Sequence, residues 1–229
     1  MKSIIHAPTN RLENSIDFYK RLNFEVISKE NPTLVTDGKA VIEINPDRFA
    51  RAGVKLYKDS WSKEIAELQK LTAVAQIENG HLLSDPSGVW IYLIEDKLGM
   101  TYEPQENSFG ITGNFAGLSL ETTDIAKSVN LWNILGFSKS MGEIEQGWIA
   151  NTSEDGLTVS LMAPLNCPHL FFNPSMTYFN GGNNLSIIQK IREAEIPITE
   201  EITHFNKEGI VDNIIIRDPG GYGFFIFND

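Results

Sequence analysis

The chain has 229 residues, 41% of them hydrophobic and 21% charged, which is the composition of an ordinary globular protein. Its 19 basic and 30 acidic residues give a net charge of −11, which argues against nucleic acid or an anionic membrane surface as a partner. The single cysteine, Cys167, excludes an internal disulfide framework and multi-cysteine metal sites, and no apolar run reaches the ~20 residues that span a bilayer. With no signal peptide at its start, we expect a cytoplasmic protein, monomeric or homodimeric.

The first half of the chain contains two runs in which a strand is followed by a helix and three further strands. Apolar residues at helical spacing predict helices over 14–22 and 62–71, the second capped by Ser60 or Ser62. The expected strands are 3–6, 24–28, 33–36 and 40–44 in the first run, and 54–57, 73–77, 81–84 and 90–94 in the second.

The second half shows the same order of elements. We expect helices over 124–134, with Asp124 as the cap, and over 184–194. The expected strands are 116–121, 137–141, 148–151 and 157–162 around the first helix, and 176–179, 198–203, 212–217 and 222–227 around the second. The sequence therefore predicts four βαβββ units.

Two landmarks show that the halves are related. The pattern Ser-x-x-Phe-Tyr-x-x-Leu-x-Phe at 15–24 is matched at 128–137, with Leu-Trp in place of Phe-Tyr, at a constant offset of 113 residues. An Asp-Pro-x-Gly turn occurs at 85–88 and again at 218–221. We predict a first domain over 1–97, a linker over 98–113 and a second domain over 114–229, the pairing of the four units being open.

These units and landmarks resemble the vicinal oxygen chelate superfamily, which includes glyoxalase I, bleomycin-resistance proteins and extradiol dioxygenases. The resemblance implies an α+β fold in which pairs of βαβββ units form cup-shaped sheets around a ligand. It also implies a divalent metal held by His, Gln or Glu side chains on the first and last strands of the units. Because this fold hosts several chemistries, the resemblance does not define an activity.

The positions that the resemblance assigns to metal ligands carry unsuitable residues here. Counting from the helix serines leads to Ile4 and Gly117, and counting from the Asp-Pro turns leads to Tyr92 and Phe225. The opening strands of the second and fourth units place the remaining positions near Gly53 and near Ser175 or Met176. A catalytic metal site needs about three protein ligands, so we expect no metal and no other cofactor.

A displaced ligand set is the alternative. His6 lies two residues beyond Ile4 on the same strand face, and Glu43 lies on the fourth strand, with Tyr92 across the cup. His6 is otherwise a strand histidine hydrogen-bonded within the sheet, or a residue that contacts a ligand. Cys167 is interpreted as a loop thiol.

Apolar and aromatic residues at the metal positions turn the cups into hydrophobic pockets, unless these side chains simply fill them. Strand alternation brings a small set of residues into the cups, and we take these as candidate ligand-binding residues. They are His6, Glu43, Lys55, Trp90 and Tyr92 in the first cup, and Ser119, Glu121, Phe225 and Phe227 in the second.

Three functions follow for this sequence. The first is metal-free binding or sequestration of a small, partly apolar or aromatic molecule. The second is a metal-dependent lyase or related enzyme resembling glyoxalase I. The third is a scaffold with filled cups that associates with a partner protein.

Overall fold

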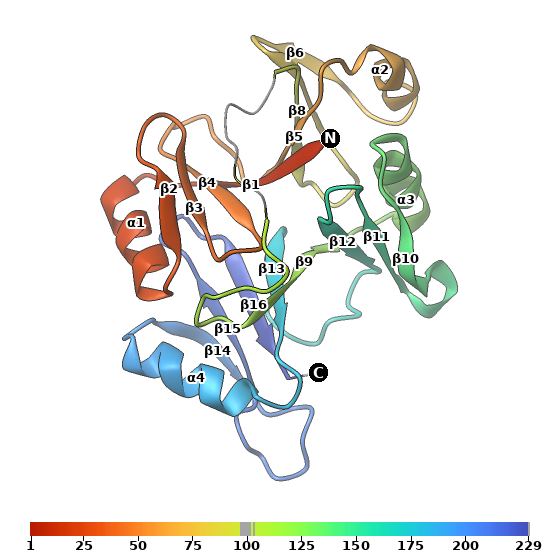
Figure 1. Ribbon diagram of the computed structural model, residues 1–229. Coiled ribbons are helices and arrows are strands. Elements are labelled where there is room, and N and C mark those ends of the chain that lie inside the picture. The colour runs from red at the N-terminus through yellow and green to blue at the C-terminus, as the bar shows by residue number, and fades with distance from the viewer. Residues whose placement is uncertain (97–101, 103, 229) are drawn as a thin grey trace.

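The computed structural model describes residues 1–96, 102 and 104–228, and its strands form two eight-stranded sheets, one from each half of the chain (Figure 1). Within these residues, no helix is both long and apolar enough to cross a membrane.

The first sheet contains two βαβββ units. The first unit consists of β1 (Lys2–Pro8), α1 (Leu12–Arg21), β2 (Glu25–Ser28), β3 (Thr33–Thr36) and β4 (Val41–Asn45). The second consists of β5 (Gly53–Tyr57), α2 (Ser62–Leu68), β6 (Ala75–Ile77), β7 (Gly80–Ser84) and β8 (Trp90–Ile94). The strand order is β2-β3-β4-β1-β5-β8-β7-β6, so the two opening strands pair in the middle, antiparallel to one another.

The second sheet repeats this arrangement. Its first unit consists of β9 (Asn114–Glu121), α3 (Ile125–Ile134), β10 (Ser138–Glu143), the short 3-10 helix η1 (Ile144–Gln146), β11 (Trp148–Thr152) and β12 (Thr158–Met162). Its second consists of β13 (Ser175–Phe179), α4 (Asn184–Glu193), β14 (Ile198–Ile202), β15 (Asn213–Arg217) and β16 (Gly223–Phe227). The order β10-β11-β12-β9-β13-β16-β15-β14 again places the opening strands in the middle.

The predicted α+β fold of four βαβββ units is confirmed, and the two units of each half share a sheet. The predicted boundaries 1–97, 98–113 and 114–229 stay a prediction, because part of that linker lies outside the described residues. The described residues in the later part of this linker pack on the first half: the Phe109 backbone nitrogen donates to the Asp37 carbonyl at 2.6 Å, and that of Ile111 to the Leu22 carbonyl at 2.9 Å.

Strand alternation separates two faces on each sheet, as predicted. Val54, Leu56, Ile91 and Leu93 of the first sheet face the helices, together with Phe224 and Ile226 of the second, and all are buried in one hydrophobic core. The opposite face of each sheet is the cup. We call the face built from β1–β8 the first cup and the face built from β9–β16 the second cup.

Helices from one half pack against the other half. Figure 1 shows α1 and α4 on one side of the molecule and α2 and α3 on the other, and α2 contacts α3 directly. The ring centroid of Phe18 on α1 lies 5.7 Å from that of Phe224 on β16. The two units of each half therefore share a sheet, whereas the helix layers join units from different halves, the first with the fourth and the second with the third. A single core spans both halves.

Two buried hydrogen bonds join the halves at equivalent places. The Tyr19 hydroxyl of α1 donates to Asp218 Oδ2 at 3.0 Å, and the Trp132 indole nitrogen of α3 donates to Asp85 Oδ2 at 3.1 Å. The other oxygen of each aspartate closes its own Asp-Pro turn, accepting from the backbone nitrogens of Tyr222 at 2.8 Å and Ser87 at 2.9 Å. The two landmarks that revealed the repeat thus contact one another across the halves.

Some elements differ from the predictions at their ends. The first helix begins at Leu12 rather than at residue 14, and α2 ends at Leu68 instead of 71. Trp61, rather than Ser60 or Ser62, occupies the N-cap position of α2, and the Glu95 carboxylate accepts its backbone nitrogen at 2.7 Å. The Ser60 hydroxyl still accepts the Ser62 backbone nitrogen, at 3.2 Å. The Asp124 cap is confirmed, with a 2.9 Å bond from the Lys127 nitrogen.

Removing the hydroxyl of Tyr19 tests the contact between the halves. We expect Tyr19→Phe to lower the free energy of unfolding by about 1–3 kcal/mol, because Asp218 Oδ2 then stays buried without this donor. Urea denaturation measures the change.

Tyr92→Phe is the matched control, because among the described residues the Tyr92 hydroxyl accepts a hydrogen bond only from the exposed Arg51 backbone nitrogen, at 3.2 Å. We expect that variant to stay within about 0.5 kcal/mol of the parent. Equal effects of the two substitutions would contradict a special role for the Tyr19–Asp218 bond.

Candidate functional site

The first cup contains a self-paired polar network. The Lys55 ammonium lies 2.8 Å from Glu43 Oε1, to which it donates, and 2.7 Å from Oε2, where the contact is an ion pair without hydrogen-bond alignment. The Asn45 amide also donates to Glu43 Oε1, at 3.0 Å. Glu43 is 3% exposed, so its charge is compensated inside the protein rather than by water.

His6 belongs to the same network. Its Nδ1 lies 2.8 Å from the Arg51 carbonyl, which only accepts, so Nδ1 carries the proton and Nε2 accepts from the Asn45 amide at 3.0 Å. Burial, and next the Lys55 ammonium, lower the pKa of His6 to about 4. The imidazole is therefore neutral at pH 7, and neither nitrogen is free to bind another group.

Backbone register aligns the counted metal positions in one row. Ile4 on β1 pairs with Lys55 on β5, which pairs with Tyr92 on β8. Gly53, the residue expected in this row, instead lies one row away between His6 and Trp90. The residue of β5 that pairs with Ile4 is therefore Lys55, two residues beyond the predicted Gly53. The prediction was wrong because counting along the chain does not give the register between β1 and β5.

Tyr92 and Trp90 complete the first cup. The Tyr92 ring meets the His6 ring edge-on at 4.7 Å, and the Lys55 ammonium lies 5.8 Å from its centroid. Trp90 is 36% exposed and lies at the margin of the network. The structure therefore brings His6, Glu43, Lys55 and Tyr92 together, bonded mainly to each other.

The second cup has small residues at the equivalent positions. The row Gly117–Thr177–Phe225 matches Ile4–Lys55–Tyr92, with Thr177 in place of the expected Ser175 or Met176. In the neighbouring row, Ser119 and Ser160 match His6 and Glu43. The first cup has the Lys55–Glu43 ion pair at these positions, whereas the second has the shorter hydroxyl side chains of Thr177 and Ser160. These shorter side chains fill less of the second cup.

A cavity of about 560 Å³ opens on this face of the second sheet. Aromatic and sulfur-containing side chains form much of its wall: Met141, Trp148, Met162, Cys167, Phe179, Phe225 and Phe227. Six residues with hydroxyl groups also line it: Ser119, Ser140, Thr152, Thr158, Ser160 and Thr177. None of the described residues that line it carries a formal charge.

The other part of the second cup is filled by the loop between β12 and β13. The Phe171 ring of this loop packs edge-on against Phe225 at 5.0 Å, and Phe172 joins the same small core. Phe225 is 1% exposed and touches both this core and the cavity. We predicted that aromatic residues either fill the cup or line a pocket. In the second cup they do both, because Phe171 and Phe172 fill one part and Phe225 and Phe227 line the cavity in the other.

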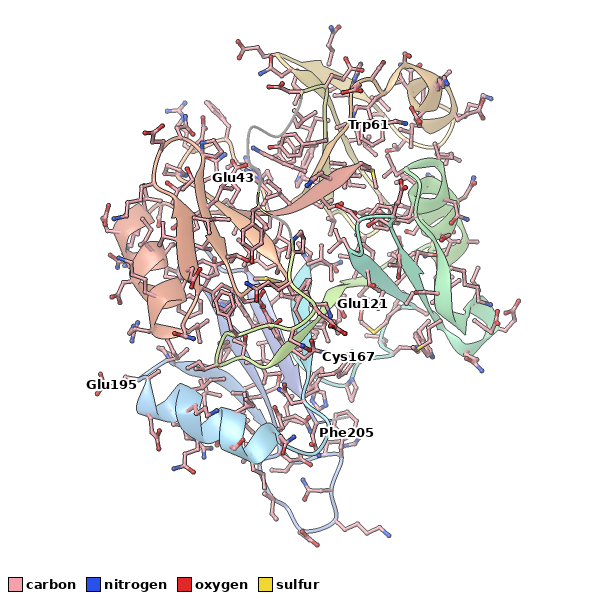
Figure 2. The ribbon with its side chains drawn as sticks, in the orientation of Figure 1. Glu43, Trp61, Glu121, Cys167, Glu195 and Phe205 are labelled. Carbon is pink, nitrogen blue, oxygen red and sulfur yellow. The ribbon has the colours of Figure 1, made fainter. Side chains whose placement is uncertain are left out.

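Glu121 lies beside the cavity rather than in its wall. Its carboxylate accepts the Leu165 backbone nitrogen at 3.2 Å, which ties the loop to the end of β9. Figure 2 shows Glu121 and Cys167 in the same region of the second half, with Glu43 in the first half. Burial, and then the charges of Glu121 and Glu200, raise the pKa of the Cys167 thiol.

Comparison with known proteins identifies the architecture. No family model matches the chain, and no curated protein matches it either. Solved structures do match, over 99% of this chain. The 2,3-dioxygenase LapB from Pseudomonas sp. KL28 aligns with 16% identity over 91% of its length at a TM-score of 0.58. The 2,2',3-trihydroxybiphenyl 1,2-dioxygenase from Sphingomonas wittichii aligns with 14% identity over 89% at 0.58, and the homoprotocatechuate 2,3-dioxygenase from Arthrobacter globiformis with 13% over 78% at 0.56.

The chain has the vicinal oxygen chelate fold. The resemblance drawn from the repeated landmarks is confirmed at the level of fold. At these identities the likeness does not extend to chemistry, which has to be argued from the side chains.

The metal that the vicinal oxygen chelate fold implies does not fit the residues present. The row in the second cup offers no side chain at Gly117, a hydroxyl at Thr177 and a hydrocarbon ring at Phe225. The row in the first cup contains Lys55, whose ammonium is itself a cation and forms an ion pair with the Glu43 carboxylate. Among the described residues, no group of three His, Cys, Asp or Glu side chains could hold a metal ion.

Most residues of the cavity wall were not predicted from the sequence. Met141, Trp148 and Ser160 lie on β10, β11 and β12, and Cys167 lies in the loop that follows. Alternation along β11 and β12 could have found Trp148 and Ser160, because Trp148 pairs with Met162 and Ala150 with Ser160 on the cup face. A β-bulge between Lys139 and Met141 interrupts the alternation in β10. The approach of Cys167 depends on the path of a loop, for which no pattern exists.

Acid titration tests the buried, neutral state of His6. Its folded pKa of about 4 lies below the unfolded value of 6.5, so the unfolded chain binds more protons between these values. The contribution is complete above about pH 6.5 and is lost as the pH falls through 4. We expect the wild type to lose about 3 kcal/mol more stability than His6→Gln between pH 7 and pH 4, measured by urea denaturation at each pH.

His204→Gln serves as the control, because His204 is exposed. This variant should follow the wild type. Parallel losses in the wild type and His6→Gln would show that His6 is not the titrating group.

Proposed function

We propose that this protein binds or sequesters a small, mainly apolar molecule in the second cup, without a metal. The observation that carries the proposal is the uncharged cavity of about 560 Å³, which lies in the volume range of small-molecule sites. A few hydroxyl groups among aromatic walls suit an apolar ligand that is oriented by one or two hydrogen bonds. We also propose that the protein works in the cytoplasm.

The aromatic lining favours a ligand that is itself partly aromatic. Trp148, Phe179 and Phe227 approach the cavity from three strands, and flat rings gain from edge-on or offset contacts with such walls. Ser119, Phe225 and Phe227 of the predicted set line this cavity. In the first cup, a ligand would have to break the Lys55–Glu43 pair, which favours a structural role for that network.

A metal-dependent enzyme is the second candidate, supported by the likeness to the dioxygenases. His6 and Glu43 are the residues that such an enzyme would have to use. Their nearest atoms, Nε2 and Oε1, are 3.7 Å apart, but Asn45 and Lys55 already occupy both groups. The donor set therefore supports this candidate less well than metal-free binding.

Alkylation of Cys167 reports on occupation of the cavity, because this thiol lines it and the chain has no other cysteine. We expect the neutral probe N-phenyl-1-naphthylamine to slow the reaction of Cys167 with iodoacetamide and to raise the melting temperature. At 100 times its dissociation constant, a ligand stabilises the folded state by about 2.7 kcal/mol.

Filling the cavity provides the control. Ser160→Phe places a ring inside the cup and should abolish protection, whereas Ser186→Phe on the exposed face of α4 should leave it intact. Equal protection in the two variants would place the probe elsewhere. No response to any neutral aromatic probe would favour the scaffold function.

Metal analysis separates the two leading candidates. After purification and exposure to Fe²⁺, Mn²⁺ or Zn²⁺ followed by desalting, we expect well below one equivalent of metal per chain, because the aligned rows lack ligands. Stoichiometric metal that disappears in His6→Ala and Glu43→Ala would overturn metal-free binding and favour the enzyme.

A further inference from the structure

We propose that the ligand of the second cup is an uncharged apolar molecule carrying one carbonyl oxygen, which accepts hydrogen bonds from Ser160 and from the Ser119–Thr177 pair. This inference rests on the proposed function and names the ligand class for that site. Three features of the cavity carry it: its lack of charge, the use of most of its hydroxyl protons, and the position of those that remain.

An anionic ligand has no partner in this cavity. The described lining residues include no lysine, arginine or histidine, and an ionised carboxylate buried without a partner is strongly disfavoured. The charges that act on the Cys167 thiol in the cavity wall are negative, those of Glu121 and Glu200. Their field adds repulsion for an anion to the desolvation penalty.

Three of the six cavity hydroxyls form a closed chain. Thr152 donates to Ser140 at 2.9 Å, and Ser140 donates to the Ala150 carbonyl at 3.2 Å. Thr158 lies 3.0 Å from Thr152. Because the proton of Thr152 is already used on Ser140, Thr158 is the donor in that contact. The chain ends on a backbone carbonyl and leaves no proton for a ligand.

The remaining hydroxyls keep two protons. Ser119 and Thr177 lie 2.6 Å apart and share one hydrogen bond, so whichever oxygen accepts still carries a proton of its own. The side-chain hydroxyl of Ser160 makes no hydrogen bond within the part of the chain that the structure describes. Ser160 pairs with Ser119 across β12 and β9, and both side chains line the cavity. Two free protons therefore remain among aromatic walls, one on Ser160 and one within the adjacent Ser119–Thr177 pair.

A carbonyl oxygen is a neutral group that matches two neighbouring donors, because its two lone pairs accept both and it brings no further proton that needs a partner. A hydrocarbon would leave both donors without a partner in an apolar enclosure, which is unfavourable. The site thus selects a ketone, an amide or a similar neutral carbonyl compound over its hydrocarbon and carboxylate counterparts.

Three matched probes test this selection: 2-acetylnaphthalene, 2-ethylnaphthalene and 2-naphthoate. Protection of Cys167 from iodoacetamide gives the dissociation constant of each at pH 7. We expect the ketone to bind roughly three- to tenfold more tightly than the hydrocarbon. We expect the carboxylate to bind at least about tenfold more weakly than the ketone.

Ser160→Ala should remove most of the ketone's advantage and leave the affinity for 2-ethylnaphthalene unchanged, whereas Ser186→Ala should preserve the advantage. The inference alone is overturned if 2-ethylnaphthalene protects Cys167 but 2-acetylnaphthalene gains nothing, if 2-naphthoate binds as tightly as the ketone, or if Ser160→Ala keeps the preference. If none of the three probes protects Cys167, the proposed function fails and the inference falls with it.

Discussion

Two buried aspartates hold the halves of this protein together. Asp85 and Asp218 each close their own turn with one oxygen and accept an aromatic donor from the other half with the second. Burial raises the pKa of Asp218 to about 6, so this carboxylate depends on its donors to remain ionised at neutral pH. Since these contacts lie in the helix layer, the helices of one half pack on the other, and both cups face away from the shared core.

The two sheets have the same strand order, so the cups differ through the side chains at a few equivalent positions. The size and charge of these side chains decide whether a cup is filled or holds a cavity. His6, Glu43 and Lys55 satisfy one another in the first cup, whereas Ser119, Ser160 and Thr177 leave space and free protons in the second. Duplication thus gave one scaffold twice, and divergence made one cup a buried polar network and the other a cavity.

Prediction from sequence worked where the determinants are local. The helix of 124–134 and its Asp124 cap follow from periodicity and a short-range hydrogen bond, and the alternation of Ile91 and Tyr92 assigned each to the correct face of the sheet. It was wrong where contacts from distant segments decide. Gly53 was expected in the row of Ile4, but inter-strand register put Lys55 there.

The sequence by itself determined the order of the elements, the duplication and the absence of metal-binding residue types at the counted positions, because each of these depends on spacing along the chain. Only the tertiary structure decided which units share a sheet, that Tyr19 meets Asp218, and which hydroxyl protons in the cavity remain free. Those outcomes depend on distances between residues far apart in the chain, and the physical reason is that a hydrogen bond forms only when folding brings both partners within about 3 Å.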